Sequence, residues 1–519
     1  MTKLKSYLFK RLFAAFFIAC FSACFAINLS AAEQEAQKRE FRGAWLHLIG
    51  QTQWMKMPTN KAKAYIQDQL DKLQAAGCNA VIFQVRPTAD AAYKSDLEPW
   101  TSWLTGRRGK APDPMWDPME FTIQEAHNRG MEFHAWLNPY RVSSNLSTDN
   151  IPADHDSKKH PERYFKYDGK LFFDPAYQEN RDFICKVVED IMSRYDVDAI
   201  HIDDYFYPYP AAGNPFNADA ASYAKFGKGM NKADWRRHNV DLLIKQLHDT
   251  MRATKPWVRF GVSPFGIWRN KKNDPRGSNS NGLQNYDDLY ADVLLWSNNG
   301  WIDYLAPQLY WNLDLQVAPS RHLAEWWDKN VKAPTQLYIG QDTKRTMDVA
   351  DARTKAKNEL ASKIELSRRL KNVEGNVWWH GYWVTENYKG VRDSLQNHFQ
   401  RTIALPPTWD NLAVKGDDKR PQAPSNLRIE RYDGKTFLEW EAPKKHDRED
   451  DAVKFVVYSF LPDENMQNLD DPETIVALTG MTRVKISDDM DPMSIEGLRF
   501  AVTSLDRLNR ESRPVTLRR

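Results

Sequence analysis

The chain has 519 residues and a formal net charge of +3, so it is too long for one ordinary domain and long enough for a barrel with an appended module. Residues 1–32 carry four basic and no acidic side chains, which leaves the remainder with a net charge of −1. That balance disfavours nucleic acid or an anionic membrane surface as a partner.

The first 32 residues have the composition of a secretory signal peptide. A basic start precedes the apolar run Leu12–Leu29, and Ser30–Ala32 offers small residues to a signal peptidase. Polar residues interrupt the run and no stop-transfer flank follows, so a membrane-spanning helix is the weaker interpretation. Phe21–Cys24 also resembles a lipobox, so a lipid anchor at Cys24 is an alternative. We expect an exported protein of the periplasm or cell envelope, with peripheral membrane association only if it is lipidated.

Between residues 39 and 410 the chain alternates eight β-rich runs with eight helical patterns, which is the count for a (β/α)₈ TIM barrel. The predicted strands are Phe41–Leu48, Asn79–Val85, Met131–Leu137, Ala199–Asp203, Arg259–Ser263, Tyr304–Leu309, Gln336–Gly340 and Asn376–His380. The predicted helices are Lys61–Ala76, Pro118–Arg129, Glu179–Arg194, Trp235–Lys255, Tyr286–Ser297, Arg321–Val331, Ala350–Leu370 and Asn387–Thr402. An open doubly wound sheet is the alternative, but no glycine-rich nucleotide turn follows the first strand.

Polar residues recur at every second position near the ends of four predicted strands. They are Gln84, Arg86, His134, Trp136, Asn138, His201, Asp203, Gln308 and Tyr310. Period-two alternation directs one set of side chains to the surrounding helices and the other into the barrel. Active sites of such barrels lie at the carboxyl ends of the strands. Each residue alone is explained as a hydrogen-bonded core group, but convergence from four strands predicts a site at this mouth.

Two adjacent carboxylates, Asp203 and Asp204, end the apolar run Val197–Ile202 and precede the aromatic segment Tyr205–Tyr209. Desolvating a carboxylate costs several kcal/mol. Carboxylates beside flat rings are what cleavage of a sugar chain requires, because acids act on the glycosidic oxygen and rings stack on sugar faces. A capped strand end with a salt-bridged Asp pair is the alternative. The doublet is therefore the predicted catalytic pair.

The remaining candidates come from the strand ends and from the long loops that follow them, which are rich in Trp, Tyr and Arg. The predicted substrate-binding residues are Arg86, Asp90, Glu98, His134, Asn138, Tyr140, Arg141, His201, Tyr205, Trp268, Gln308, Tyr310 and Trp311. Of these, the rings are expected to stack on sugars, and the amide and guanidinium groups to bind hydroxyl or acetamido groups.

A polar linker at residues 411–421 precedes an all-β region over residues 422–519. Its predicted strands are Asn426–Tyr432, Thr436–Glu441, Val453–Phe460, Thr474–Leu478, Arg483–Ile486, Arg499–Ser504 and Pro514–Leu517. This pattern predicts a small immunoglobulin-like sandwich without an inter-sheet disulfide. Pro421–Leu427, Leu438–Trp440 and Val456–Tyr458 resemble a fibronectin type III module. After the signal only Cys78 and Cys185 remain, and both are expected to be buried thiols.

Six sequence motifs are distributed along the predicted barrel. They are Phe41–Leu46, Phe83–Asp90, His134–Arg141, His201–Pro208, Gly261–Arg269 and Ile302–Trp311. In this order they resemble the glycosyl-hydrolase-like family 10 proteins of bacterial envelopes. The resemblance implies a (β/α)₈ glycosidase-like domain in an exported protein or lipoprotein, a trailing fibronectin-like module, bacterial cell-wall glycan as the substrate class, and the Asp203–Asp204 doublet as the centre.

Asp204, at the strand terminus, is the expected general acid, and Asp203 is its partner, whose like charge raises the pKa of Asp204. An N-acetyl carbonyl of the substrate could instead serve as nucleophile with Asp203 orienting it. Glu98, Asp90 and Asp314 are fallback partners. Retaining, inverting and substrate-assisted schemes all stay open.

Two other function classes remain. A metal-dependent deacetylase would use His134, His201 and Asp203 as ligands, although no His pair at i, i+4 spacing supports it. A non-catalytic glycan-binding protein would use the barrel only as a scaffold. We expect no metal and no cofactor, and a polysaccharide as the partner.

Overall fold

The computed structural model describes residues 36–146, 151–413, 420–488 and 497–517. The predicted signal peptide, with Cys24, lies outside these residues, as do residues 414–419 of the predicted linker. Within the described residues, no helix combines the length and the apolar character needed to cross a membrane.

Eight strands close into a parallel barrel, which confirms the predicted fold class. The strands are β1 (Phe41–Leu46), β2 (Ala80–Arg86), β3 (Glu132–Leu137), β7 (Ala199–Ile202), β8 (Arg259–Val262), β9 (Tyr304–Leu305), β10 (Gln336–Asp342) and β11 (Val373–Trp379). Closure is direct, because Gly43 of β1 pairs with Ala80 on one side and Val377 on the other. The carboxyl ends of all eight strands therefore meet at one mouth.

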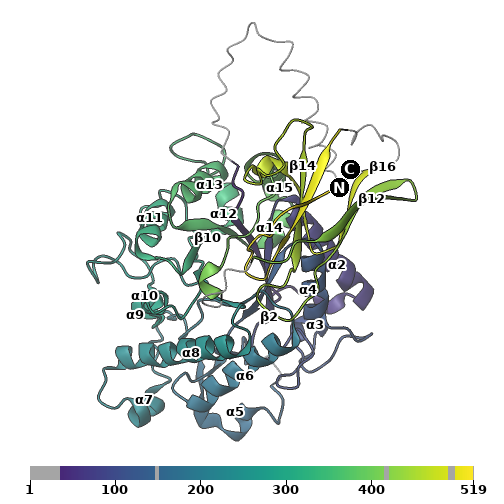
Figure 1. Cartoon of the computed structure of the whole chain (residues 1–519). Helices are drawn as coiled ribbons and strands as arrows, with labels where there is room; N and C mark the ends of the chain where they lie inside the picture. Colours follow the sequence, from purple (N-terminus) through teal and green to yellow (C-terminus); the bar gives the residue numbers. More distant parts are fainter. Residues whose placement is uncertain (1–35, 147–150, 414–419, 489–496, 518–519) are drawn as a thin grey trace.

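Helices surround this barrel (Figure 1). The longer ones are α2 (Thr59–Ala75), α4 (Pro118–Asn128), α6 (Gln178–Arg194), α8 (Lys232–Thr254), α11 (Ser320–Asn330) and α13 (Leu360–Arg369). Each buries an apolar stripe, as α6 does with Ile184, Val187 and Ile191. Cys78 and Cys185 are buried thiols, as predicted.

Three predicted helices differ from the structure. Residues 350–370 are helical only over α13, and the other two are divided into shorter pieces. Residues 286–297 divide into α9 (Asn285–Asp288) and α10 (Val293–Asn298), because Tyr290 takes a positive φ and Asp292 caps α10 by accepting a hydrogen bond from Leu295 N. Residues 387–402 form a 3-10 turn at Tyr388–Gly390, α15 (Val391–Ser394) and a π-helical turn at Leu395–Phe399, because Asn387, Lys389 and Gly390 take positive φ angles.

The loops after the strands carry structure that the sequence pattern did not predict. After β3, the strands β4 (Arg141–Ser143), β5 (Tyr164–Tyr167) and β6 (Lys170–Phe173) form an antiparallel sheet, with α5 (Asp156–Lys159) beside it. After β7 comes α7 (Ala220–Phe226). Helices α5 and α7 lie at the lower edge of Figure 1, away from the C-terminal strands at the upper right.

The C-terminal region is a sandwich of two antiparallel sheets. Its strands are β12 (Ser425–Tyr432), β13 (Lys435–Glu441), β14 (Lys454–Phe460), β15 (Ile475–Thr479), β16 (Arg483–Asp488), β17 (Arg499–Leu505) and β18 (Val515–Thr516). One sheet has the order β12-β13-β16 and the other β15-β14-β17-β18. Trp440 and Leu438 of the first sheet pack on Phe455, Val457 and Val502 of the second. The finer assignment to fibronectin type III stays a prediction.

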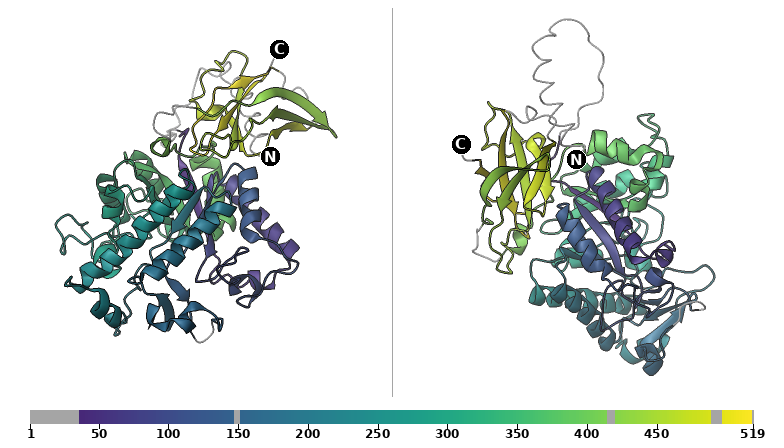
Figure 2. Two further views of the ribbon diagram at one scale, coloured as in Figure 1. Left: turned by 60° about the horizontal axis from the view of Figure 1, so that its bottom comes forward. Right: turned by 90° about the vertical axis from the view of Figure 1, so that its right-hand side faces the viewer.

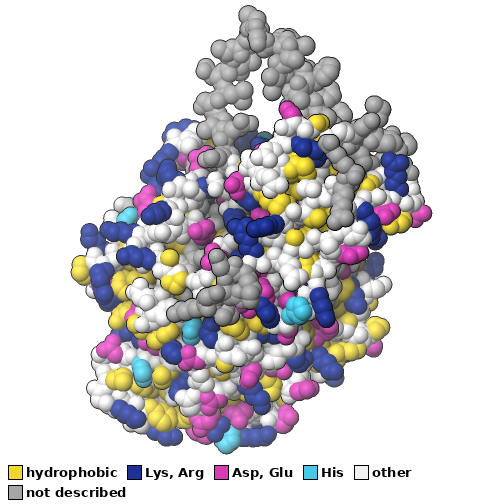
Figure 3. All heavy atoms as spheres, viewed as in Figure 1, with side chains coloured by type: hydrophobic (Ala, Val, Ile, Leu, Met, Phe, Trp, Pro, Cys, Tyr) yellow, Lys and Arg dark blue, Asp and Glu magenta, His cyan; other side chains and the backbone are white. Residues whose placement is uncertain are grey.

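The sandwich packs against the amino ends of the barrel strands, here called the floor; both views in Figure 2 place it against the barrel domain. Leu508, in the loop after β17, joins the buried cluster that contains Phe41 and Trp409. On the other side of the floor, Gly480 N donates to the carbonyl of His127 at the end of α4. On the face in Figure 3, basic and acidic side chains are interspersed.

Candidate active site

The doublet lies at the carboxyl end of β7, in the mouth of the barrel. β7 is hydrogen-bonded to β3 on one side and β8 on the other, so it is a fully buried strand. Asp203 and Asp204 follow it directly and are each only 4% exposed. Two carboxyl groups are therefore held next to each other in a dry setting.

Asp203 is fixed by its neighbours on β3. Its Oδ2 accepts from Trp136 Nε1 at 3.0 Å, and its Oδ1 accepts from Asn138 Nδ2 at 3.1 Å and from Tyr205 N at 3.2 Å. Burial raises the pKa of Asp203, and the charge of Arg141 opposes that rise. Three donors leave this carboxyl group with one orientation.

Asp204 is positioned to carry a proton. It accepts hydrogen bonds from the Tyr209 hydroxyl and from the Gln308 side chain. Burial raises the pKa of Asp204 to about 6, and the negative charge of Asp203 contributes to the rise. A carboxyl group with this pKa is partly protonated near neutral pH, as a general acid must be.

Aromatic rings form one wall of the mouth, here called the platform: Tyr310, Trp379 and Trp45. Tyr310 and Trp379 stack at 6.2 Å with an interplanar angle of 10°. Trp45 meets both edge-on, at 6.5 and 6.4 Å. Tyr310 and Trp379 are half-buried, as is the nearby Trp311, which packs on Phe265 at 5.4 Å. Flat, partly open rings beside carboxyl groups suit a sugar ring.

A cavity of about 370 Å³ adjoins the doublet, here called the mouth pocket. Its lining residues are Ile49, Arg141, Ser144, Tyr167, Asp168, Lys170, Phe172, Tyr205, Pro208 and Tyr209. The Arg141 guanidinium lies 4.2 Å from the centre of the Tyr205 ring, and that ring is 39% exposed. The structure thus brings together Asp203, Asp204, Asn138, Arg141, Tyr205, Gln308 and Tyr310 of the predicted site. Trp311 is linked to them through Phe265, which contacts Tyr209.

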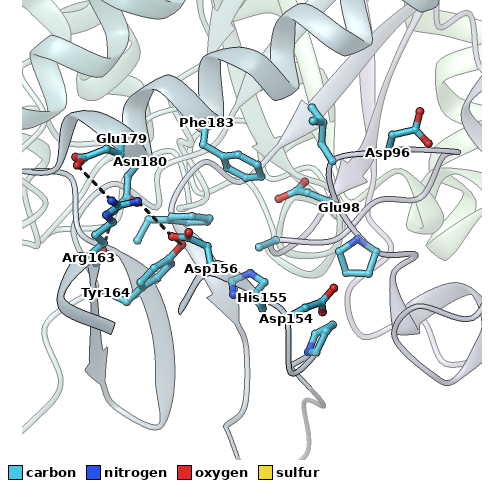
Figure 4. Close-up of a pocket in the computed structure, with 15 residues that line it drawn as sticks. Asp96, Glu98, Asp154, His155, Asp156, Arg163, Tyr164, Glu179, Asn180 and Phe183 are labelled. Atoms are coloured by element: carbon cyan, nitrogen blue, oxygen red, sulfur yellow. Dashed lines mark hydrogen bonds and ion pairs between the residues drawn. The ribbon is translucent and has the colours of Figure 1, made fainter. Parts of the chain in front are cut away.

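Arg86 and Glu98 are occupied by each other. Arg86 Nη2 and Nε donate to the two Glu98 oxygens at 2.6 and 2.7 Å, and both side chains are buried. Arg86 also donates to the backbone carbonyl of Asn138. Glu98 lines a separate cavity of about 540 Å³ between its own loop, residues 152–164 and α6 (Figure 4). The pair therefore supports Asn138 from behind, and a direct substrate contact does not fit this geometry.

The other fallback carboxylates are also held by arginines. Asp90 is buried and pairs with Arg108 at 3.2 Å. Asp314 pairs with Arg353 at 2.7 Å and with Arg321 at 3.3 Å. Within the part of the chain that the structure describes, neither carboxylate contacts the doublet, so a distant second carboxylate from these positions does not fit the geometry.

His134 and His201 lie below the mouth, inside the barrel. Each ring is at most 1% exposed, and both nitrogens of each are hydrogen-bonded, to Glu132 and Tyr304 for His134 and to Tyr304 and Ser263 for His201. Burial lowers the pKa of both rings. Their predicted roles as substrate or metal ligands therefore do not fit. Among the described residues, no group of three or more His, Cys, Asp or Glu is arranged to hold a metal ion.

Tyr140 and Trp268 are core residues and not open stacking surfaces. Tyr140 is 1% exposed and Trp268 3%. Trp268 stacks on Trp326 of α11 at 5.7 Å. The loop after β8 packs this ring against the helical layer, and Tyr140, which follows β3, is equally closed to solvent. Neither ring offers the open stacking surface that was expected.

Several mouth residues were not among the predicted site residues. Trp136 belongs to the inward-facing set of β3, and Tyr209 belongs to the aromatic segment after the doublet, so both carried a signal. Trp379 ends β11, while its neighbour Trp378 is fully buried. The two tryptophans are adjacent in the sequence and point to opposite faces of β11. Only Trp379, the last residue of the strand, points into the mouth, and the sequence does not show which of the two does so.

Comparison with known proteins shows the family of the chain. The family model described as glycosyl hydrolase-like 10 matches residues 40–357. The chain belongs to this family. It is 37% identical over 486 residues to the glycosyl hydrolase YngK of Bacillus subtilis (strain 168), with 92% of each chain covered. It is 38% identical over 330 residues to the glycosyl hydrolase DigH of Escherichia coli (strain K12), covering 60% of this chain and 74% of DigH.

Among solved structures, the glycoside hydrolase domain of PgaB (BpsB) from Bordetella bronchiseptica is similar at a TM-score of 0.44 with 11% identity, over 69% of this chain and 98% of that domain. A likeness this distant carries no information about individual site residues.

Proposed function

We propose that this protein is a glycoside hydrolase that cleaves bacterial cell-wall glycan built from N-acetylated sugars. The observation that carries the proposal is Asp204, a buried carboxyl group with a pKa raised to about 6, next to the fixed carboxylate of Asp203 and within electrostatic reach of Tyr310 in the platform. Membership of a glycosyl hydrolase-like family supports the reaction class.

The contacts of the doublet favour a substrate-assisted scheme. The fallback carboxylates are held by arginines, whereas Asp203 lies beside Asp204 with its orientation fixed. An acetamido carbonyl oxygen then attacks the anomeric carbon, the bond to the glycosidic oxygen breaks, and Asp204 gives its proton to that oxygen. Asp203 accepts the acetamido N–H and stabilises the positive charge of the cyclic intermediate.

Water completes the reaction in this scheme. It adds to the anomeric carbon, returns one proton to Asp204 and reopens the acetamido ring. Because the anomeric carbon is attacked twice, the configuration is retained. Proton NMR of the first product anomer checks this outcome, and an inverted product would require a water-activating base other than the acetamido group.

The site of action follows from the sequence. The basic and apolar start of the chain is a predicted export signal, with Cys24 as an alternative point of lipid attachment. We propose that the protein acts in the periplasm or cell envelope, where its glycan would be found.

The deciding experiment is incubation with purified peptidoglycan glycan strands, with and without a chelator, using wild type and Asp204→Asn. Release of sugar fragments by wild type in the presence of chelator, lost in the variant, is the expected result. Loss of wild-type release with chelator would point to the metal-dependent class. Binding without release would point to a non-catalytic glycan-binding protein.

A further inference from the structure

A buried chain of hydrogen bonds runs through the barrel interior from the floor toward the mouth. The successive contacts, here called the axial chain, are Glu132 Oε2 to His134 Nε2 at 3.0 Å, His134 Nδ1 to the Tyr304 hydroxyl at 2.8 Å, that hydroxyl to His201 Nδ1 at 2.9 Å, and His201 Nε2 to Trp45 Nε1 at 3.2 Å. All five side chains are at most 2% exposed. The proposed catalysis uses none of these contacts.

The donor properties of the groups fix the direction of every bond in the chain. An indole N–H can only donate, so His201 Nε2 accepts from Trp45 and its ring proton sits on Nδ1. That proton is donated to the Tyr304 oxygen, so the Tyr304 hydroxyl donates its own hydrogen to His134 Nδ1. His134 then carries its proton on Nε2 and donates it to Glu132. Both histidines are neutral, in opposite tautomers.

The floor end of the axial chain is anchored by the C-terminal sandwich. Glu132 Oε1 accepts from Asn509 Nδ2 at 2.9 Å and lies 3.5 Å from Lys454 Nζ. Arg259 of β8 approaches the same oxygen at 2.7 Å. Lys454 and Asn509 are both buried. Two of the three groups that contact Glu132 Oε1 therefore come from outside the barrel.

The mouth end of the chain lies directly beneath the proposed acid. Ser263 Oγ bonds to His201 Nε2 at 2.9 Å, and the Ser263 carbonyl accepts from Gln308 Nε2 at 2.9 Å. Gln308 is the residue whose side chain also bonds to Asp204. Trp45, the last donor of the chain, belongs to the platform.

Space for the central tyrosine is made by a glycine. A Cβ at Gly261 of β8 would lie 1.9 Å from Tyr304 Cζ, so any larger residue there would displace the ring that joins the two histidines.

We propose that the sandwich is part of the catalytic apparatus: Lys454 and Asn509 hold Glu132, and the axial chain transmits that anchorage to Gln308, Asp204 and the platform. Tyr304 and His201 are then positioning residues, acting through Gln308 and Trp45. This inference rests on the proposed function for its kinetic consequences only, because the arrangement of protons is a property of the folded protein itself.

The first test is ¹⁵N NMR of the full chain with labelled histidine, assigned with His201→Gln and His134→Gln. The expected result is His201 protonated on Nδ1 and His134 protonated on Nε2, both neutral at pH 7. A proton on His201 Nε2 would overturn the deduced direction of the chain. This measurement needs no substrate.

The second test asks whether the floor and the mouth are coupled. Asn509→Gly removes the amide that binds Glu132 but tolerates the positive φ of that position. The indole N–H resonance of Trp45 should shift in this variant. A matched substitution, Tyr338→Phe, removes a neighbouring buried hydroxyl that bonds Gln336 and lies outside the chain, so it should leave the Trp45 resonance in place. No shift in Asn509→Gly would contradict the coupling.

The third test is kinetic. Tyr304→Phe breaks the chain at its centre and should lower kcat about 10-fold or more with little change in KM, because displaced catalytic groups lose far more rate than binding. Tyr338→Phe should lower Tm and keep wild-type kcat. Wild-type kcat in folded Tyr304→Phe would overturn the positioning role. If wild type releases no sugar, the proposed function fails, while the two NMR measurements still decide the axial chain.

Discussion

Carboxyl groups are buried at both ends of this barrel, yet their pKa values move in opposite directions. Burial alone would raise the pKa of Glu132 at the floor, but the charges of Arg259 and Lys454 and the hydrogen bond from His134 hold it well below its usual range. At the mouth, burial raises the pKa of Asp204 to about 6 and Asp203 adds to the rise. Equal burial thus produces a permanent anion where cations are supplied and an exchangeable proton where they are not.

The largest expected effect is the loss of hydrolysis when the carboxyl groups at the mouth are changed. Asp204→Asn should lower the hydrolysis rate by about 10²–10⁴-fold, because proton delivery to the leaving oxygen is lost, and Asp203→Asn should do nearly as much harm. Sugar release by purified variants of matched circular dichroism measures this. Wild-type rates in folded Asp204→Asn would place the acid elsewhere.

The next effect is on the free energy of unfolding, which should change in opposite directions for variants at the floor and at the mouth. Glu132→Gln should destabilise the fold by about 3–5 kcal/mol, because it leaves Arg259 buried without its anion. Asp204→Asn should instead stabilise the protein at pH 8 by on the order of 1–2 kcal/mol, because a desolvated charge is removed. Chemical denaturation of both variants gives the two free energies. Equal signs would contradict the contrast between floor and mouth.

The pH dependence sharpens the same contrast. The folded-state pKa of Asp204 is raised, so its favourable contribution to stability is present below about pH 4 and is lost as the pH rises through about 6. The folded-state pKa of Glu132 is lowered, so its contribution is present above about pH 4 and is lost as the pH falls further. Denaturation of wild type and of each variant from pH 3 to 8 should show these opposite windows.

Activity should follow the mouth and not the floor. Because the acid must be protonated, kcat/KM should fall as the pH rises through about 6, the value to which the pKa of Asp204 is raised. A kcat/KM that stays constant from pH 5 to 8 would show that Asp204 is not the catalytic acid.

The smallest expected effect concerns the aromatic residues. Trp379→Ala should weaken glycan binding several-fold, since a stacked ring contributes on the order of 1 kcal/mol beyond area burial. Trp268→Ala, a matched loss of an indole that packs on Trp326, should lower Tm and leave glycan affinity unchanged. Titration with glycan fragments measures the affinity of each variant, and thermal denaturation measures its Tm. Weaker glycan binding in Trp268→Ala would show that this ring contacts the substrate.

The sequence pattern predicted the barrel and the doublet because both are local signals. Alternation within β3 and β7 identified inward-facing residues, and Asp203 and Asp204 end an unmistakable apolar strand. The failures are long-range. Nothing near Glu98 in the sequence indicates that Arg86 occupies it, and the direction of the Trp268 loop depends on α11. The sequence pattern also does not show how far along the barrel axis a side chain lies. His134 and Asn138 alternate on the same side of the third strand, but His134 lies in the barrel interior and Asn138 lies at the mouth.

The placement of Lys454 and Asn509 against Glu132 has a consequence for how the molecule forms. These two residues, which bind the carboxylate of the third barrel strand, follow it by more than three hundred positions. Contacts so distant in sequence are slow to form. Until they form, the polypeptide is only partly folded and prone to aggregate. We therefore expect the mouth to reach its final arrangement only after the sandwich has packed against the floor.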